Sequence, residues 1–320
     1  MKRTIGLFWV MVASNMYARS PEEAQATSYG ADTKVVFFVK DDQGLAVSNA
    51  LVKAGFYLNG KKGNSVRAFT ETNGILVAEK KSVGEINYWI NKEAYYETSG
   101  RLNFVRKGVS DGRWQPYGAT NTVVLKRKVS PVAMFVRRGG DGLLPPVRDE
   151  FLGFDLEKGE WVAPHGTGKV ADLCIKYECE PGSPPQLYYR GVVTFSFTNR
   201  FDGAYRQEKE PFSTFPSVYR ADTNAAYRQE LRFAYDRMSG KPKEDTRLPD
   251  SGYLVLRTRS VTDREGRLVS ARYSKVYGPV EADVGGVYFS SYFNPNENDP
   301  NLEADATKNL LNPRDLGFPP

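Results

Sequence analysis

Three aromatic side chains are the residues of this sequence with the clearest means to bind a ligand. In the run 85–91, Trp89 shares its parity with Asn87 and Asn91, opposite to the apolar side chains between them. Successive side chains on a strand point to opposite faces, so these three are predicted to share one face. Sugars stack their apolar faces on such rings while amides bond their hydroxyls. The pattern leaves one alternative open, in which Trp89 packs beneath another domain or a covering loop.

Trp114 and Tyr117 are the other two candidates. They lie in the loop 112–118, beside Arg113 and Gln115. An exposed ring beside guanidinium and amide groups suits the same chemistry, so Trp114 and Tyr117 are predicted to be exposed and to extend a glycan-binding surface.

Catalytic motifs are not apparent. The one histidine, His165, excludes a site with two histidine ligands, and no Gly-x-Ser-x-Gly elbow accompanies it. Gly166–Lys169 resembles a phosphate loop, but Ala163 and Val170 stand where that motif needs Gly and Ser or Thr. Gly139–Gly142 precedes no helical pattern, so it is not a dinucleotide fingerprint. No catalytic, cofactor-binding or metal site is predicted.

Carboxylates keep one enzymatic alternative open, because glycoside hydrolysis needs two acids and no histidine. Asp149, Glu150, Asp155 and Glu157 are candidates, although no spacing singles out an acid and a nucleophile. The acidic residues after position 294 lack the order of a calcium loop.

The two cysteines, Cys174 and Cys179, are five residues apart and would point to opposite faces of one strand. A disulfide between them would need a turn or bulge. A bonded pair and two separate thiols both remain open.

The elements that would carry these residues read as strands. The chain has 320 residues, with 19 Tyr and 18 Phe concentrated in short alternating runs that turn signals separate. Residues 230–236 fit both a strand and a helix, and strand is favoured. Residues 253–261 and 268–277 predict a long hairpin. The predicted fold is all-β, with two tandem β-sandwich-like domains at 33–128 and 129–293.

The order of residues at 44–52 and then 70–77 resembles the carboxypeptidase regulatory-like (transthyretin-like) domain, and the segment 92–96 fits the same family. The resemblance covers residues 33–128, with Ala46 where Pro is usual. It implies an accessory β-sandwich without catalytic residues. Residues 154–159 and 294–303 give the second half a resemblance to uncharacterised secreted bacterial proteins, which implies no function.

The first 18 residues have the pattern of a secretory signal peptide: Lys2 and Arg3, an apolar run over 5–13, and small residues between Ala13 and Ala18 where cleavage would fall. Residues 19–32 are predicted to be a flexible leader, and 294–320 an extended tail. No apolar run is long enough to span a membrane.

The net charge is +6, and it falls to +4 without Lys2 and Arg3. No run of five or six basic residues marks a nucleic-acid arm, so nucleic acid is not an expected partner.

Together these observations predict a secreted or periplasmic, non-enzymatic binding protein without cofactors, whose partner is an envelope glycan or protein. The alternatives are a structural spacer or assembly subunit of the cell envelope, and a carboxylate-dependent hydrolase.

Overall fold

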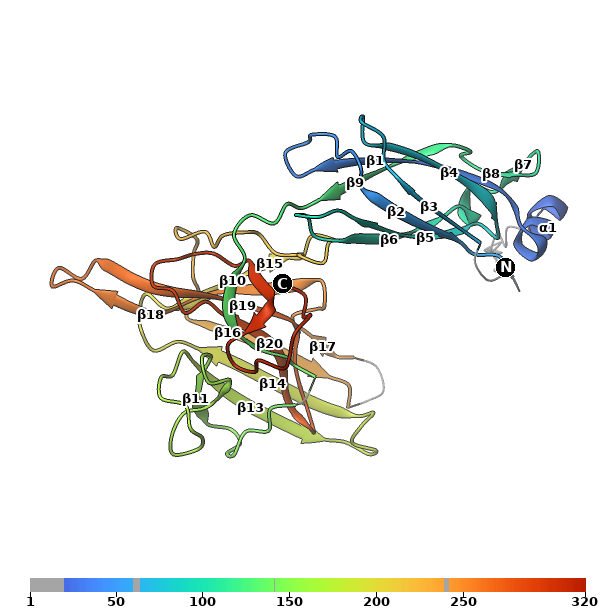
Figure 1. Cartoon of the computed structure of the whole chain (residues 1–320). Helices are drawn as coiled ribbons and strands as arrows, with labels where there is room; N and C mark the ends of the chain where they lie inside the picture. Colours follow the sequence, from blue (N-terminus) through green and yellow to red (C-terminus); the bar gives the residue numbers. More distant parts are fainter. Residues whose placement is uncertain (1–19, 60–63, 141, 239–241) are drawn as a thin grey trace, which may run out of the picture. The chain divides into compact units, whose positions relative to one another are not determined.

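The computed structural model describes residues 20–59, 64–140, 142–238 and 242–320. The chain is all-β, as predicted, with one short helix and one 3-10 turn among the described residues. It divides into two compact units (Figure 1). The first ends at Lys92 and resumes over Thr98–Leu125, and the second comprises Glu93–Glu97 and Lys126–Pro320.

The first unit is a sandwich of two sheets. One sheet has the order β4-β1-β8-β7, with β9 also paired to β1, and the other has the order β3-β2-β5-β6. The strands are β1 (Ala31–Asp41), β2 (Leu51–Phe56), β3 (Ser65–Phe69), β4 (Ile75–Ser82), β5 (Glu85–Asn91), β6 (Thr98–Asn103), β7 (Val109–Ser110), β8 (Arg113–Trp114) and β9 (Ala119–Leu125), and the 3-10 turn η1 spans Val105–Lys107.

The core of the first unit explains which face of each strand is exposed. Val35 and Phe37 of β1 are fully buried, as is Ile86 of β5. Phe37 meets Tyr88 edge to face, with ring centroids 5.3 Å apart. Because β5 alternates strictly, burying its even-numbered side chains turns the odd-numbered ones outward.

The predicted flexible leader at 19–32 is wrong, because this segment contains a capped helix, α1 (Pro21–Tyr29), and the first residues of β1. Ser20 and Glu23 form a reciprocal capping box. The Glu22 carboxylate accepts a hydrogen bond of 2.7 Å from the Gly112 backbone N–H, which ties the helix to the β7–β8 turn. The predicted signal peptide, residues 1–18, lies outside the described residues.

The second unit is a larger sandwich of two six-stranded sheets, ordered β15-β18-β19-β20-β10-β21 and β12-β11-β13-β14-β16-β17. Its strands are β10 (Val132–Arg137), β11 (Phe151–Asp155), β12 (Glu160–Trp161), β13 (Leu173–Pro181), β14 (Tyr189–Ser196), β15 (Gly203–Glu208), β16 (Glu230–Asp236), β17 (Glu244–Asp245), β18 (Gly252–Thr262), β19 (Leu268–Asp283), β20 (Gly286–Phe293) and β21 (Ala304–Asn309). The strand at 230–236 and the long β18–β19 hairpin confirm two sequence predictions.

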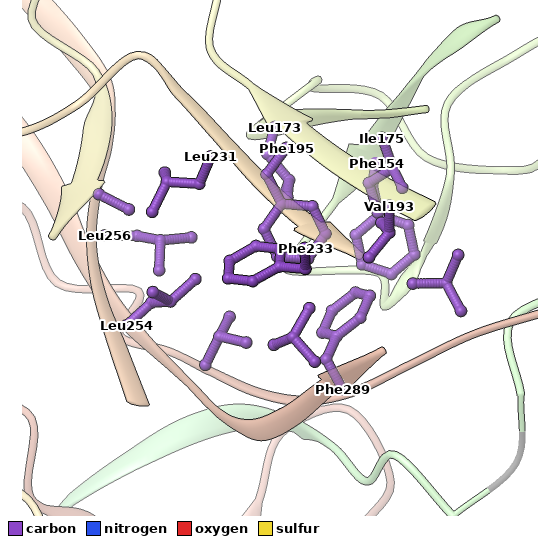
Figure 2. Close-up of a cluster of buried hydrophobic side chains, with 14 of the residues drawn as sticks. Phe154, Leu173, Ile175, Val193, Phe195, Leu231, Phe233, Leu254, Leu256 and Phe289 are labelled. Atoms are coloured by element: carbon purple, nitrogen blue, oxygen red, sulfur yellow. The ribbon is translucent and has the colours of Figure 1, made fainter. Parts of the chain in front are cut away.

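The main core of this unit lies between its two sheets (Figure 2). Phe154, Phe195 and Phe233 come from β11, β14 and β16. The Phe289 ring of β20 packs edge to face on Phe154 and Phe195, with centroids 5.6 and 5.5 Å away. Aromatic pairs in these orientations add about 0.5–1.5 kcal/mol each beyond the apolar area that they bury.

The predicted extended tail at 294–320 is also wrong. Residues 304–309 form β21, which pairs in parallel with β10, and Leu302 and Phe318 are buried beside it. The segment is polar and lacks alternation, so its placement depends on β10, about 170 residues earlier in the chain. No helix among the described residues is long and apolar enough to cross a membrane.

Candidate binding surface

The outward side of the β3-β2-β5-β6 sheet gathers the side chains best suited to hold a ligand. We call this surface the Trp89 face. It consists of Leu51, Lys53, Gly55, Tyr57, Ser65, Arg67, Phe69, Glu85, Asn87, Trp89, Asn91, Ser99, Arg101 and Asn103.

Strand register places these residues in rows across the sheet. The central row runs Arg67, Lys53, Trp89 and Ser99. In the row on one side, Leu51 lies between Phe69 and Asn91. In the row on the other side, Asn87 lies between Gly55 and Arg101. Directly paired residues have Cβ atoms about 4.5–5.5 Å apart. Trp89 therefore has a cation on one side and an amide in each neighbouring row.

The aromatic residues of the Trp89 face are open to solvent. The exposed fractions are 45% for Trp89, 56% for Phe69 and 57% for Tyr57. Strand spacings of about 4.8 Å and rises of about 3.3 Å per residue place the other two rings roughly 12–14 Å from Trp89. As the sequence predicted, Trp89 is exposed and shares its face of β5 with Asn87 and Asn91.

Gly55 contributes no side chain to the Trp89 face, where it lies opposite Asn87 and one row from the Lys53–Trp89 pair. Its backbone does not require glycine, since a β-carbon there would meet one atom, the Asn87 carbonyl oxygen, at an ordinary 3.7 Å. Glycine inside a strand costs roughly 0.5–1 kcal/mol relative to alanine. Neither packing nor conformation explains the residue, which contributes no side chain between Ser65 and Asn87.

The prediction for Trp114 is wrong, because this side chain is 1% exposed. It lies in β8 and donates from Nε1 to the Ser82 carbonyl oxygen at 2.8 Å. Gly84 packs against its ring. Trp114 therefore belongs to the core of the first unit and offers no surface to a ligand.

Tyr117 is half-buried and lies beside the other sheet, not on the Trp89 face. Its hydroxyl donates to the Glu79 carboxylate. The Arg113 guanidinium lies 4.9 Å from the ring centroid. The hydrogen bond from Tyr117 lowers the pKa of Glu79. These contacts hold the ring in a local charge network, so the structure does not bring the three candidate aromatics together.

Two of the four carboxylates considered for a hydrolase, Asp155 and Glu157, join Asp172 in an ion-pair cluster of the second unit. Arg259 donates from Nε and Nη2 to Asp172 at 2.8 and 3.0 Å, from Nη1 to Glu157 at 2.8 Å, and from Nη2 to Asp155 at 3.2 Å. The side chains of Asp155 and Asp172 are 2% and 0% exposed. Burial raises the pKa of Asp172, against the opposing effect of Arg259.

Asp155 also accepts four backbone N–H hydrogen bonds, from residues 157, 158, 169 and 170. Its carboxylate is therefore committed to the local fold. Asp149 and Glu150, the other two acids considered, are both exposed on the surface.

A second buried polar cluster gave no signal in the sequence. Lys275 is 0% exposed, and its Nζ lies 2.9 Å from Ser217 Oγ and about 5 Å from the ring centroids of Phe215, Tyr277 and Tyr292. In the described part of the chain no carboxylate lies within 4 Å of this amine. Burial, followed by the charge of Lys126, holds the pKa of Lys275 well below its usual value.

Serine and lysine side chains in contact can form a nucleophilic dyad. Ser217 is fully buried like Lys275, so a substrate carbonyl cannot reach its hydroxyl. The cluster therefore packs the second unit, and β19 alternation explains how Lys275 shares a face with Tyr273 and Tyr277.

The remaining residues that the sequence singled out stay apart. Cys174 and Cys179 are free thiols on β13, and burial raises the pKa of each. His165 is exposed on a loop. Across the described residues, no group of three or more His, Cys, Asp or Glu side chains could hold a metal ion.

Comparisons with known proteins give limited likeness. No family model and no curated protein matches the chain. Among solved structures, it is similar to 3-chlorocatechol 1,2-dioxygenase from Rhodococcus opacus 1CP, at 13% identity and a TM-score of 0.26 over 31% of this chain and 61% of that one. Hydroxyquinol 1,2-dioxygenase from Pseudomonas putida DLL-E4 matches at 14% identity and a TM-score of 0.24, over 31% and 57%. The chain thus spans about three fifths of the length of these enzymes.

Proposed function

We propose that this chain is a secreted or periplasmic, non-enzymatic protein that binds a glycan of the cell envelope through the Trp89 face. The observation that carries the proposal is an indole that is 45% exposed, with an amide in each neighbouring row of the same sheet. Rings of this kind offer a flat apolar surface, and amides on either side offer both donors and acceptors to sugar hydroxyls.

The Trp89 face is the outward side of a sheet, and this supports binding to a long polymer instead of a small molecule. Phe69 and Tyr57 are exposed on either side of Trp89 and would contact further sugar units along the same face. Small-molecule sites are usually concave and bury most of their ligand, whereas an open sheet face contacts one side of a chain. The resemblance to an accessory regulatory-like domain is consistent with such a role and stays a prediction.

The rival functions lack a comparable observation. A carboxylate-dependent hydrolase would need two acids facing a substrate, whereas Asp155, Asp172 and Glu157 bind Arg259. A spacer or assembly subunit would use sheet edges for self-association, whereas the exposed side chains described above lie on the face of a sheet.

The test is cosedimentation of the chain without residues 1–18 with envelope fragments, before and after the fragments are treated with protease. Binding that survives protease treatment and falls about tenfold or more in Trp89→Ala is expected. Phe151→Ala is the matched control, because Phe151 is an exposed ring of similar exposure, 48%, in the second unit. Binding that protease abolishes, or that Trp89→Ala leaves unchanged, would overturn the proposal.

A further inference from the structure

Two cations lie side by side next to Trp89 without an acidic partner. Lys53 and Arg67 are direct cross-strand partners on β2 and β3, and Lys53 is the direct partner of Trp89 on β5. Within the described ranges, no carboxylate oxygen lies within 4 Å of either charged group. Like charges placed directly opposite each other destabilise a sheet. The repulsion between Lys53 and Arg67 therefore lowers stability, and no ion pair of these two residues with a described carboxylate offsets it.

Two other cations of the same unit are paired with acids. Lys34 lies opposite Glu79 in the other sheet, with 3.5 Å between Nζ and Oε2. Arg101, at the far end of the Trp89 face, forms an ion pair with Glu85. Lys53 and Arg67 are therefore cations of the Trp89 face that have no such partner among the described residues, and Lys53 lies directly beside the ring.

We infer that the Trp89 face selects acidic polysaccharides, with Lys53 and Arg67 binding the oxyanion of a sugar that stacks on Trp89. This inference rests on the proposed function. A Cβ separation of about 5 Å between Lys53 and Trp89 brings the ammonium within reach of a group on the rim of a stacked ring. The Arg67 guanidinium can bind a carboxylate through two parallel hydrogen bonds.

Gly55 fits the same ligand. Its missing side chain opens the corner between Lys53 and Trp89, so a bulky acidic substituent can lie close to the sheet without a clash. Nucleic acid fits this surface less well, because single strands need a basic groove that follows many phosphates together with successive stacking rings. On this face two neighbouring cations lie beside Trp89, and the third, Arg101, is paired with Glu85.

The experiment compares polygalacturonate with its methyl ester, which keeps the sugar backbone and removes the charge. We expect the native chain to bind the acidic polymer more tightly, with an affinity that falls as salt rises from about 10 mM to about 1 M. The double variant Lys53→Gln, Arg67→Gln should lose about tenfold or more in affinity for the acidic form. Its affinity for the ester should not change.

Two further variants serve as controls. Lys80→Gln with Lys81→Gln removes the same charge from exposed positions on β4, in the other sheet, and should bind both polymers like the native chain. Gly55→Thr suits a strand and points outward, so the chain should fold and should lose binding to both polymers.

The outcomes separate this inference from the proposed function. If Trp89→Ala abolishes binding to both polymers but the Lys53, Arg67 variant keeps native affinity for the acidic form, the face binds glycans without charge selection and the inference fails. If the native chain binds neither polymer nor envelope glycan, the proposed function fails. Equal or tighter binding to oligo(dT), or to vesicles of phosphatidylglycerol, would replace acidic-glycan selection with a general attraction to polyanions.

Discussion

Replacing Arg259 with methionine tests the role assigned to the buried ion-pair cluster. The guanidinium makes four hydrogen bonds to three carboxylates, of which Asp155 and Asp172 are almost fully buried. Removing one partner from a buried pair costs about 3–5 kcal/mol, because the remaining charge stays buried without compensation. Methionine keeps a β-carbon, so the backbone strain at φ 52° is the same in both proteins.

The expected loss of unfolding free energy can be measured as a decrease in Tm. The second unit has about 200 residues, and for domains of that size each kcal/mol shifts Tm by about 2–4 °C. Arg259→Met should therefore lower the Tm of this unit by about 6–20 °C. Arg267→Met is the matched control, since this arginine lies in the same hairpin, is 72% exposed and pairs with Asp263 at 2.8 Å. Exposed pairs contribute about 0–1 kcal/mol.

The loss should also depend on pH. Without the guanidinium, the pKa of Asp172, already raised by burial, rises further above the unfolded value of about 3.9. The folded variant then binds a proton that the unfolded chain has released, so its stability falls as pH rises through this window. Thermal unfolding of both proteins at about pH 4.5 and 8 should show the larger difference at the higher pH. Equal losses in Arg259→Met and Arg267→Met, or a loss independent of pH, would refute the reasoning.

Three further substitutions test other parts of the fold. Lys275→Met removes an amine whose pKa is depressed in the folded protein. The stability of the native protein should therefore rise with pH, from the folded pKa of Lys275 toward its unfolded value of about 10.4. Thermal unfolding at about pH 7 and 9.5 should show this rise in the native protein and not in the variant. Glu303→Gln should cost about 1–3 kcal/mol in denaturant unfolding, because the carboxylate accepts from the Tyr96 hydroxyl and from the backbone N–H groups of Val129 and Ser130. Trp114→Phe leaves the Ser82 carbonyl without its donor and should lower stability by about 1–2 kcal/mol, whereas Trp89→Phe should leave Tm unchanged.

Alternation along the sequence was sufficient to predict the parts of the fold that depend on local pattern. The run 85–91 gave both the β5 strand and the outward direction of Trp89, because a period of two fixes the face of every side chain. Turn residues at 263–266 likewise marked the β18–β19 hairpin. The helix at 21–29 was missed, although Ser20, Pro21 and Glu23 carry a capping signal that local inspection could have used.

Burial of loop and edge residues could not be predicted in the same way. Trp114 lies in a two-residue strand, too short for a period, and its burial depends on Gly84 and Ser82 in another part of the unit. The charge of Lys53 and Arg67 was visible in the sequence, but their pairing with each other and with Trp89 required the strand register. Partners at long range decide such features, so one sequence does not reveal them.

Parallel pairing of the first and last strands of each unit has a consequence for how the chain is made. In the first unit β1 pairs with β9, and in the second β10 pairs with β21, so each sandwich joins its earliest strand to its last. Until residues 304–309 have been synthesised, the edge of β10 that pairs with β21 has no partner. An unpaired strand edge can pair with another chain and promote aggregation. Completion of each sandwich therefore depends on the strand of its unit that is synthesised last.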